Sequence, residues 1–349
     1  MAEVTIKDIA RECGISFSAV SKALKGSPEI SSATIELVQA AAKKMGYRAN
    51  AAARKLRTRR SYDIGVIFED ATGSGLQHQY FAAIFDALNI TANERGYNIS
   101  FLNSVNREKE SYLSQAKYRG FDGVVVASTN DFKRDDIQEL IHSDIPCCLL
   151  DYTSEKDCSS VLSDNENGIR QIIEYLISRG HRKIAYVYGD TSDVTNVRLE
   201  TFYAEMASHN LTVPKEYVIK GIYHEPKSSE NATRRLIALK NRPSCILYPD
   251  DFAYLGGMKA LVENGLIPGR DISTVGYDGI FLSSVLSPVL TTYSQNAKEI
   301  GTQLASLLIQ RIENSALDYQ IVRVKGQLRE GQTVCRLLSS GDRHKFTNF

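Results

Sequence analysis

Apolar residues recur at helical spacing in the first part of the chain. Ile6, Ile9 and Cys13 fall on one face of a first predicted helix. Thr5 can cap its N-terminus, because a carboxylate follows three residues later as in a capping box. Gly14 can end the helix, since glycine adopts the left-handed backbone conformation without steric cost. The pattern therefore predicts a short helix followed by a tight turn.

A second helix is predicted after Ser16, with Val20 facing inward, and a third from Ser31 or Ser32 to Gly46. Two short helices joined by a tight turn that contains glycine are typical of a helix-turn-helix. The outward positions of the second helix carry mostly short or polar side chains: Phe17, Ser18, Ser21 and Lys22. Such side chains can meet base edges in a major groove, so the pattern indicates DNA binding.

A basic segment rich in alanine, residues 50–57, follows the third helix. Asn50 is a favourable N-cap and the alanines favour helix. The segment allows only one or two turns, and so short a helix is marginal by itself. We therefore expect this helix to need a partner to form. Leu56 is its one large apolar side chain among arginines and lysines.

From residue 61 onward, short apolar runs alternate with amphipathic segments. Strands are predicted at residues 63–68, 97–102, 123–127, 146–150, 160–162, 183–188, 218–219, 244–248 and 272–277, with a further edge strand at 322–328. Helices are predicted at residues 81–95, 110–119, 135–141, 165–179, 194–209, 229–239, 252–263 and 296–311. Alternation of this kind is typical of a parallel sheet covered by helices on both faces. Two successive units of similar length predict two lobes with a cleft between them.

The length and the charge distribution refine this picture. The 349 residues exceed one typical domain and carry a net charge of only +1. Residues 1–60, however, hold 12 Lys and Arg against 5 Asp and Glu, and the remainder is acidic. A basic module on an acidic body indicates binding of a polyanion at one end, although a solvated charged surface is the alternative interpretation.

Several classes of protein are disfavoured. No apolar run reaches the roughly 18 residues that a membrane span needs, and the start of the chain is a capped helix and not a signal peptide, so we expect a cytoplasmic protein. The six cysteines have no CxxC spacing, and we expect buried free thiols, no metal and no cofactor. GxSxG, Walker and HExxH motifs are absent. We therefore expect no enzyme, and His78, His142, His181 and His224 are interpreted as surface or loop residues.

Polar and aromatic residues near the strand ends form a candidate pocket: Glu69, Phe81, Ser128, Asp151, Arg198, Asp250, Phe252 and Asp278. In open α/β sheets, ligands bind beyond the carboxyl ends of the strands. Carboxylates and a guanidinium give charge-assisted hydrogen bonds to sugar hydroxyls, and an aromatic side chain can cover the apolar face of the ring. The alternative is that the aspartates cap the following helices, most of all Asp251.

Residues 4–60 resemble the DNA-binding headpiece of the lactose/galactose repressor (LacI/GalR) family. The matching residues are Val4-Thr5-Ile6-Lys7-Asp8-Ile9-Ala10, Gly14-Ile15-Ser16, Val20-Ser21-Lys22, Ser31, Thr34, Gly46-Tyr47, Asn50 and Ala53-Arg54-Lys55-Leu56. The resemblance implies DNA contacts from Thr5, Ser16, Phe17, Ser18, Ser21, Lys22, Ser31, Asn50, Ala53, Lys55 and Leu56. It also implies a hinge helix that folds on the operator, pairs with its dimer mate and inserts Leu56 into the minor groove.

The resemblance continues to about Gly331 and implies a core similar to type I periplasmic sugar-binding proteins, whose chain crosses between the lobes three times. We place these crossings near residues 151–163, 277–288 and 292–297. The expected domains are a helix-turn-helix headpiece at 1–49, a hinge helix and linker at 50–60, an effector-binding and dimerisation core at 61–337, and a polar tail at 338–349. The fold class is thus α/β, with an all-α headpiece and a two-lobed, doubly wound parallel-sheet core.

Among the effector contacts that the resemblance implies, those of Arg198 and Asp278 are the best supported. Arg198 lies within the matching run Val197-Arg198-Leu199, and Asp278 lies within Val275-Gly276-Tyr277-Asp278. The chain departs from the family pattern at Glu69 and Asp250, which bears on the identity of the ligand. Glu69, Asp151, Asp250 and Asp278 face one evident cation, Arg198, so a neutral sugar suits the pocket better than a phosphosugar.

The sequence therefore predicts a sequence-specific transcriptional repressor of carbohydrate-utilisation genes. It is expected to bind a near-palindromic operator as a homodimer and to be released by a small neutral sugar. A corepressor-dependent regulator that responds to a nucleoside or purine is the alternative. A transport-associated sugar receptor has no use for residues 4–60, and an enzyme on a doubly wound fold would turn over a bound sugar.

Overall fold

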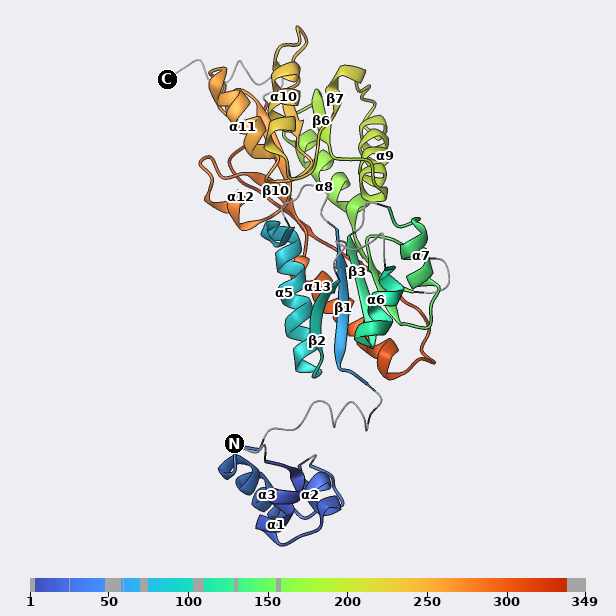
Figure 1. Cartoon of the computed structure of the whole chain (residues 1–349). Coiled ribbons are helices and arrows are strands. Elements are labelled where there is room, and N and C mark those ends of the chain that lie inside the picture. Colours follow the sequence, from blue (N-terminus) through green and yellow to red (C-terminus); the bar gives the residue numbers. More distant parts are fainter. Residues whose placement is uncertain are drawn as a thin grey trace. The chain divides into compact units, whose positions relative to one another are not determined.

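A computed structural model describes residues 4–24, 26–47, 58, 60–69, 75–102, 110–128, 131–154 and 158–337. The chain divides into two compact units, Met1–Ser61 and Tyr62–Phe349 (Figure 1). The predicted hinge contacts Asn50, Ala53, Lys55 and Leu56, and the predicted tail at 338–349, lie outside the described residues. No helix of the described part is long and apolar enough to cross a bilayer.

The first unit is a headpiece of three helices, α1 (Ile6–Cys13), α2 (Phe17–Ala23) and α3 (Ser32–Lys44). Ile9, Val20 and Val38, one from each helix, are fully buried and form the centre of a small apolar core. Gly14 ends α1 with a φ of 65°, as the sequence predicts. The helix-turn-helix expected from the spacing of the apolar residues is thus present.

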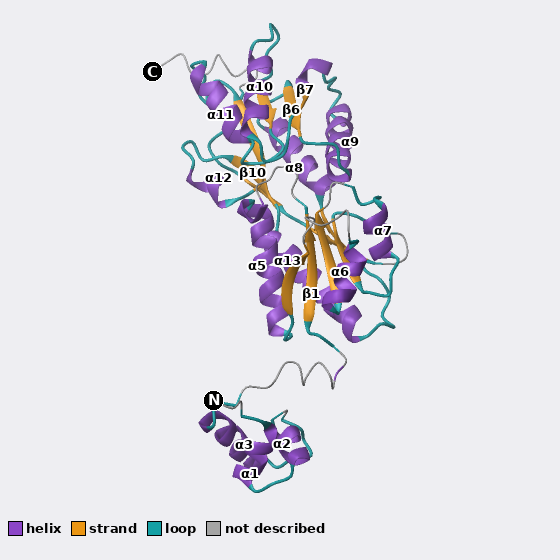
Figure 2. Cartoon of the chain, in the orientation of Figure 1, coloured by secondary structure: helices purple, strands orange, loops and turns teal. Residues whose placement is uncertain are grey.

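The second unit contains two sheets, each with helices on both faces (Figure 2). The first lobe is built on the strand order β11-β5-β4-β3-β1-β2, with every pair parallel. Its strands are β1 (Asp63–Phe68), β2 (Asn98–Leu102), β3 (Gly123–Ser128), β4 (Cys147–Leu150), β5 (Ser159–Ser163) and β11 (Ile321–Val324). Its helices are α5 (Gln79–Glu94), α6 (Tyr112–Arg119), α7 (Asp135–Ile141) and α13 (Ala297–Glu313), with the short η1 (Gly75–Gln77) before α5.

The second lobe has the strand order β12-β10-β9-β8-β6-β7. Its strands are β6 (Ile184–Tyr188), β7 (Val218–Lys220), β8 (Cys245–Leu247), β9 (Ser273–Asp278), β10 (Thr291–Ser294) and β12 (Gln327–Arg329). Its helices are α8 (Asn165–Ser178), α9 (Asp193–Ser208), α10 (Pro226–Ile237), α11 (Tyr254–Glu263) and α12 (Phe281–Val285), with the short η3 (Lys215–Tyr217) before β7. The doubly wound fold is confirmed, except that β12 runs antiparallel to β10 at the edge.

The central strands are apolar at nearly every position because both of their faces are buried. In β3, Val125 packs toward α5 and α13, whereas Val124 and Val126 pack toward α6 and α7. In β6, Tyr186 faces α8 and α9, and Val187 faces α10 and α11. Each lobe therefore has one apolar core on either side of its sheet, as parallel sheets require.

The chain crosses between the lobes three times. The sequence predicts two of these crossings and misses the third. The crossings lie after β5 at Ser163, after β10 at Ser294 and after β11 at Val324. The expected crossing at 292–297 is confirmed. The crossing expected at 151–163 lies at the end of that range, because β5 still belongs to the first sheet. The crossing expected at 277–288 is wrong, because α12 and β10 stay in the second lobe.

The missed crossing explains a further error. The run 322–328, predicted as one edge strand, forms β11 in one sheet and β12 in the other. Gly326 lies at the change, where a Cβ atom would stand 2.4 Å from the carbonyl oxygen of Ser294. Only glycine allows this close approach, and a glycine inside an alternating run is the signal that could have revealed the break.

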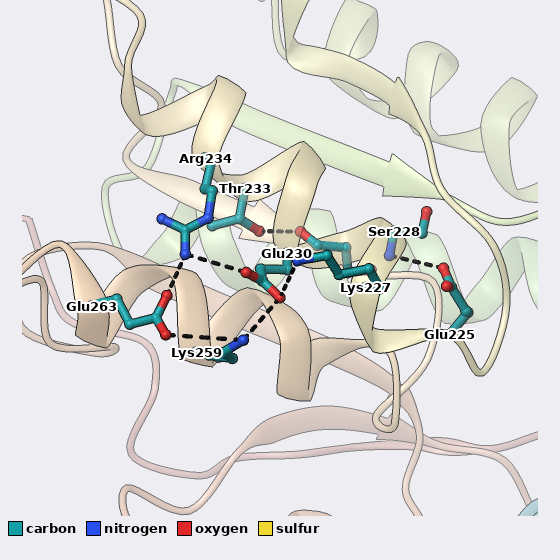
Figure 3. Close-up of polar contacts among 9 residues, drawn as sticks. Glu225, Lys227, Ser228, Glu230, Thr233, Arg234, Lys259 and Glu263 are labelled. Carbon is teal, nitrogen blue, oxygen red and sulfur yellow. Dashed lines mark hydrogen bonds and ion pairs between the residues drawn. The ribbon is translucent and has the colours of Figure 1, made fainter.

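Helices α10 and α11 are joined by a cluster of charged side chains (Figure 3). The Glu230 carboxylate accepts hydrogen bonds or ion pairs from Lys227 at 3.1 Å, Arg234 at 3.2 Å and Lys259 of α11 at 3.2 Å. The bond from Lys227, with those from the other two cations, lowers the pKa of Glu230 to about 2. The carboxylate therefore stays charged and holds the two helices together at neutral pH.

All six cysteines are free, as expected. Four are buried, but Cys13 and Cys335 are only half-buried. Two of the histidines that were interpreted as surface or loop residues are buried. His181 lies in a loop but is fully buried and bonded to Ser244 and to the carbonyl of Cys335. His78, the N-cap residue of α5, is also buried.

Candidate functional site

A cavity of about 440 Å³ lies at the strand ends of the two lobes. Its wall contains five of the eight predicted effector residues: Glu69, Phe81, Asp151, Arg198 and Asp278. Ser128 is the last residue of β3, but its side chain lies outside the described part of the structure. Asp250 and Phe252 do not line the cavity.

Two carboxylates from opposite lobes occupy strained positions at the cavity wall. Asp151 follows β4 with a φ of 54°, and Asp278 ends β9 with a φ of 97°. Such a conformation costs a non-glycine residue on the order of 1–3 kcal/mol, and it is found most often at functional sites. The surrounding hydrogen bonds hold both residues in place. Asp151 accepts from the backbone N–H of Ser163 at 2.6 Å and from its hydroxyl at 3.1 Å, and Asp278 accepts from Gln295 Nε2 at 2.7 Å.

Tyr80 links these two carboxylate sites. Its hydroxyl lies 3.2 Å from the hydroxyl of Ser163 and donates to Gln295 Oε1 at 3.4 Å. Burial, more than the nearby carboxylates, raises the pKa of Tyr80 well above its usual value, so the phenol stays protonated. Ser163 and Gln295 lie where the chain crosses between the lobes, so the network joins both sides of the cleft through two of the crossings.

The Arg198 guanidinium is buried on the second lobe. Nε donates to Asn165 Oδ1 at 2.8 Å, and Nη1 donates to the carbonyl of Pro249 at 3.3 Å. The guanidinium carbon lies 3.7 Å from the centre of the Tyr277 ring. Within the described residues Nη2 has no hydrogen-bond acceptor, and Arg198 lines the cavity, so this nitrogen is available to a ligand oxygen.

Burial governs the protonation of the two aspartates. It raises the pKa of Asp151 above its usual value, although hydrogen bonds from Ser163 and the charge of Arg198 oppose the shift. Burial likewise raises the pKa of Asp278, again against the charge of Arg198. A ligand that donates hydroxyl hydrogen bonds to both carboxylates would replace the solvation that they have lost.

Glu69 is already paired with a residue that the sequence analysis missed. Arg134 donates to both of its carboxylate oxygens, at 2.9 and 3.0 Å, and the Tyr112 hydroxyl donates at 2.6 Å. Arg134 also donates to Asp136 at 2.7 Å. The view that Arg198 is the one evident cation near these carboxylates is therefore wrong. Arg134 stands 65 positions from Glu69, so no local spacing could have revealed the pair.

Asp250 serves the backbone around it. One carboxylate oxygen accepts from the N–H of Ala253 and the other from the N–H of His224, both at 2.7 Å. This geometry agrees with the alternative interpretation of strand-end aspartates as caps. Asp251 is also internal, because it accepts from the Thr292 hydroxyl at 2.6 Å and from the N–H of Ile280 at 2.9 Å.

Phe252 is shielded from the cavity by two histidines. Its ring stacks on His224 with centroids 4.1 Å apart, and His224 stacks on His78 at the same distance. Since both neighbours are nearly parallel to His224, they must lie on its opposite faces. Of the three rings, only His78 lines the cavity. Phe252 therefore supports one end of the cleft from behind.

Several lining residues were not predicted: Phe68, Tyr80, Phe132, Lys133, Tyr152, Tyr223 and Gln295. The position of Tyr80 beside Phe81, and that of Tyr152 beside Asp151, was the available signal. Gln295 has no such signal, because its place depends on the second crossing of the chain.

The predicted DNA-contacting residues of the headpiece fall into two groups. Thr5, Ser16 and Ser31 open the three helices through local hydrogen bonds with Asp8, Ala19 and Thr34. Phe17, Ser18, Ser21 and Lys22 lie on α2, where Phe17 is 53 % exposed and Ser21 is half-buried. Lys22 pairs with Glu29 at the surface. The second group thus offers side chains on the outer face of α2.

Comparisons with known proteins agree with both units. Residues 5–50 match the family model of bacterial regulatory proteins, lacI family, and residues 173–334 match the periplasmic binding protein-like domain. The HTH-type transcriptional repressor PurR of Proteus mirabilis (strain HI4320) is 31% identical over 337 residues, which cover 95% of this chain and 96% of the relative. The probable HTH-type transcriptional repressor ExuR of Bacillus subtilis (strain 168) is 30% identical over 311 residues, or 88% and 92%.

Among solved structures, the lac repressor dimer bound to operator and the anti-inducer ONPF is similar to this chain with a TM-score of 0.78 and 24% identity. The match covers 96% of this chain and 100% of that one. This likeness shows the fold, and the sequence relatives show the family. The chain belongs to the lacI family of bacterial regulatory proteins and is a DNA-binding transcriptional repressor with a periplasmic-binding-protein-like core.

Proposed function

We propose that this repressor is controlled by a small neutral polyhydroxy effector, a sugar, bound in the cavity between its two lobes. The observation that carries the proposal is the placement of Asp151, Asp278 and Arg198 around one cavity, from both lobes. Hydroxyl groups can donate to the carboxylates and accept from Arg198, so the ligand would satisfy each of these three charges.

The charge of the cavity wall supports a neutral ligand. Six lining residues are acidic and two are basic: Glu69, Asp131, Asp151, Asp190, Asp193 and Asp278 against Lys133 and Arg198. Arg134 neutralises Glu69 but leaves an acidic excess. A phosphate would bring about −1.5 to −2 further charges into this wall. Phosphate sites instead gather Arg, Lys or bare helix N-termini.

Control of DNA binding follows from where the ligand would sit. A ligand that bonds to Asp151 in one lobe and Asp278 in the other favours one relative orientation of the lobes. Residues 50–60 directly precede the first lobe, and we propose for them the role of a hinge helix and linker, with Leu56 inserted into the minor groove. The change in operator affinity can be no larger than the ligand's differential affinity for the two states.

We also propose that the protein acts as a homodimer on a near-palindromic operator, with residues 1–49 reading one half-site and residues 61–337 carrying the effector site and the dimer contacts. One headpiece reads few base pairs, and a two-fold dimer doubles the site. Large apolar side chains are exposed on and near α5, α11 and α12 and offer a surface for the second copy: Leu76, Ile90, Val262, Phe281 and Val285. The structurally similar lac repressor is a dimer bound to its operator.

Calorimetric titration tests the effector. The protein is titrated with neutral monosaccharides and disaccharides, with sugar phosphates and with nucleosides. The expected result is binding of a neutral sugar that Asp278→Ala and Arg198→Ala each abolish, while both variants still bind DNA selected from a random pool. Tight binding of a sugar phosphate or a nucleoside, with no heat from any neutral sugar, would overturn the proposal.

A further inference from the structure

Two separate groups of aromatic side chains line the cavity on the first lobe. The first group is Phe68, at the end of β1, and Phe81, in the first turn of α5, with ring centroids 4.8 Å apart. The second group is Phe132, after β3, and Tyr152, after β4, with centroids 4.4 Å apart and ring planes within 3°. Each group can cover the apolar face of one ring of a ligand.

The strand order gives the scale of the spacing between the two groups. β1, β3 and β4 are consecutive neighbours in the first sheet. Neighbouring strands lie about 4.8 Å apart, so the ends of β3 and β4 lie roughly 5–10 Å from the end of β1 along the sheet edge. This is the scale on which two linked sugar rings succeed each other.

Stacked rings lie beside the first group, on the side of His78. His78 lines the wall beside Phe81, with ring centroids 4.9 Å apart, and His224 and Phe252 stack behind it. A second ligand ring on that side of Phe81 would meet these stacked rings. Asp151 lies at the end of β4, the strand that Tyr152 follows, so the charged centre adjoins the second group as well.

The wall of the second lobe supplies polar groups for a second ring. Asp190, Ser192 and Asn196, from the segment between β6 and α9 and the start of α9, line the same cavity. Asn196 is exposed, and its amide has no hydrogen-bond partner in the described part of the chain. These side chains can bond hydroxyls that Asp151, Asp278 and Arg198 do not reach.

The volume agrees with a ligand of this size. About 440 Å³ falls within the roughly 300–1,000 Å³ of pockets that hold drug-sized ligands, and a single monosaccharide is smaller than such ligands. From these observations we propose that the effector has two linked rings, a neutral disaccharide or comparable glycoside. One ring lies on Phe81 and Phe68, and the second lies against Phe132 and Tyr152. This inference rests on the proposed control by a neutral sugar.

Calorimetry with matched pairs tests it. Maltose, cellobiose, lactose, melibiose and sucrose are each compared with their constituent monosaccharides. At least one disaccharide is expected to bind 100-fold or more tightly than either of its components. Tyr152→Ala should weaken disaccharide binding at least tenfold and leave the affinity for the monosaccharide that occupies the first position unchanged.

Two controls make the outcome decisive. Tyr118→Ala removes a tyrosine of α6 that is 90 % exposed and does not line the cavity, so it should leave both affinities unchanged. Thermal unfolding establishes that Tyr152→Ala is folded. Phe132→Ala removes the other ring of the same stacked pair and should have the same effect on disaccharide binding. A monosaccharide that binds as tightly as every disaccharide containing it would overturn the two-ring inference alone. Failure of every neutral sugar to bind would overturn the proposed function together with it.

Discussion

The headpiece and the core use their polar residues in opposite ways. In the headpiece, polar side chains lie at helix ends and on the surface, above a small core centred on Ile9, Val20 and Val38. In the core, Arg198 is withdrawn from water, and both it and the half-buried Asp151 are held by hydrogen bonds. The comparison teaches that a surface that binds DNA can rest on a minimal apolar core, whereas a pocket for a small polar ligand needs a large, rigid support for its buried charges.

The largest expected effect comes from shortening a side chain in the small apolar core of the headpiece. Ile9→Ala removes a fully buried side chain, and such a change costs about 2–5 kcal/mol. A single small core rarely supplies more than about 3–5 kcal/mol, so the headpiece should unfold. DNA binding should be lost, while effector binding and the main thermal transition remain as in the wild type.

Ile84→Ala is the matched control, because Ile84 is equally buried but lies in the first lobe. It should lower the main transition and leave the headpiece folded. Circular dichroism and differential scanning calorimetry separate the two cases. Equal loss of the main transition in both variants would contradict the independence of the two units.

The second effect concerns a buried ion pair. Arg134→Met leaves the Glu69 carboxylate without its bidentate partner. Breaking a buried pair in this way costs about 3 kcal/mol, the lower end of the usual range, since part of Arg134 reaches solvent. Asp136→Asn, which keeps the Glu69 pair, should cost much less. Urea unfolding measures both, and similar losses would show that the Arg134–Glu69 contact is not the important one.

These contacts also show what the sequence could and could not reveal. The headpiece was predictable because its polar contacts are local: Thr5 with Asp8 and Ser16 with Ala19 are three residues apart. The alternating strands were predictable because both of their faces are buried. In contrast, Glu69 and Arg134 are 65 positions apart, and Tyr80 and Gln295 are 215 apart. Strand-end position correctly brought Asp151 and Asp278 to one cavity, but it could not distinguish a carboxylate that faces the cavity from one, such as Asp250, that bonds to backbone N–H groups.

A smaller effect is expected when the charge of the half-buried Asp278 is removed. Burial raises the pKa of Asp278 in the folded protein. A carboxyl with a raised pKa favours the folded state when protonated, so stability is lost as the pH rises from the unfolded-state value, about 3.9, through the folded-state value. Asn does not ionise, so Asp278→Asn removes this loss of stability at higher pH.

The melting temperature of Asp278→Asn should therefore exceed that of the wild type at pH 7, and the difference should shrink toward pH 4. Differential scanning fluorimetry across this range measures it, with Asp63→Asn, a half-buried strand-end aspartate, as the comparison. A lower melting temperature at pH 7 would mean that the contacts of Asp278 outweigh the cost of its burial.

The smallest effect on stability belongs to the surface of the headpiece. Lys22 and Glu29 form an exposed pair, and such pairs contribute little because water and salt screen them. Lys22→Met should leave headpiece unfolding nearly unchanged and weaken DNA binding. If Lys22 contacts a phosphate, the slope of log affinity against log salt should fall by about 1. An unchanged salt dependence would remove Lys22 from the DNA contacts.

The most direct test of the account follows DNA binding while the sugar identified by calorimetry is added. Fluorescence anisotropy of labelled, selected DNA is recorded for the wild type and for Asp278→Ala. We expect the sugar to change the DNA affinity of the wild type and to leave that of Asp278→Ala unchanged, with both proteins binding DNA equally well in its absence. An equal response of the two proteins at the same sugar concentration would contradict control through the cavity between the lobes.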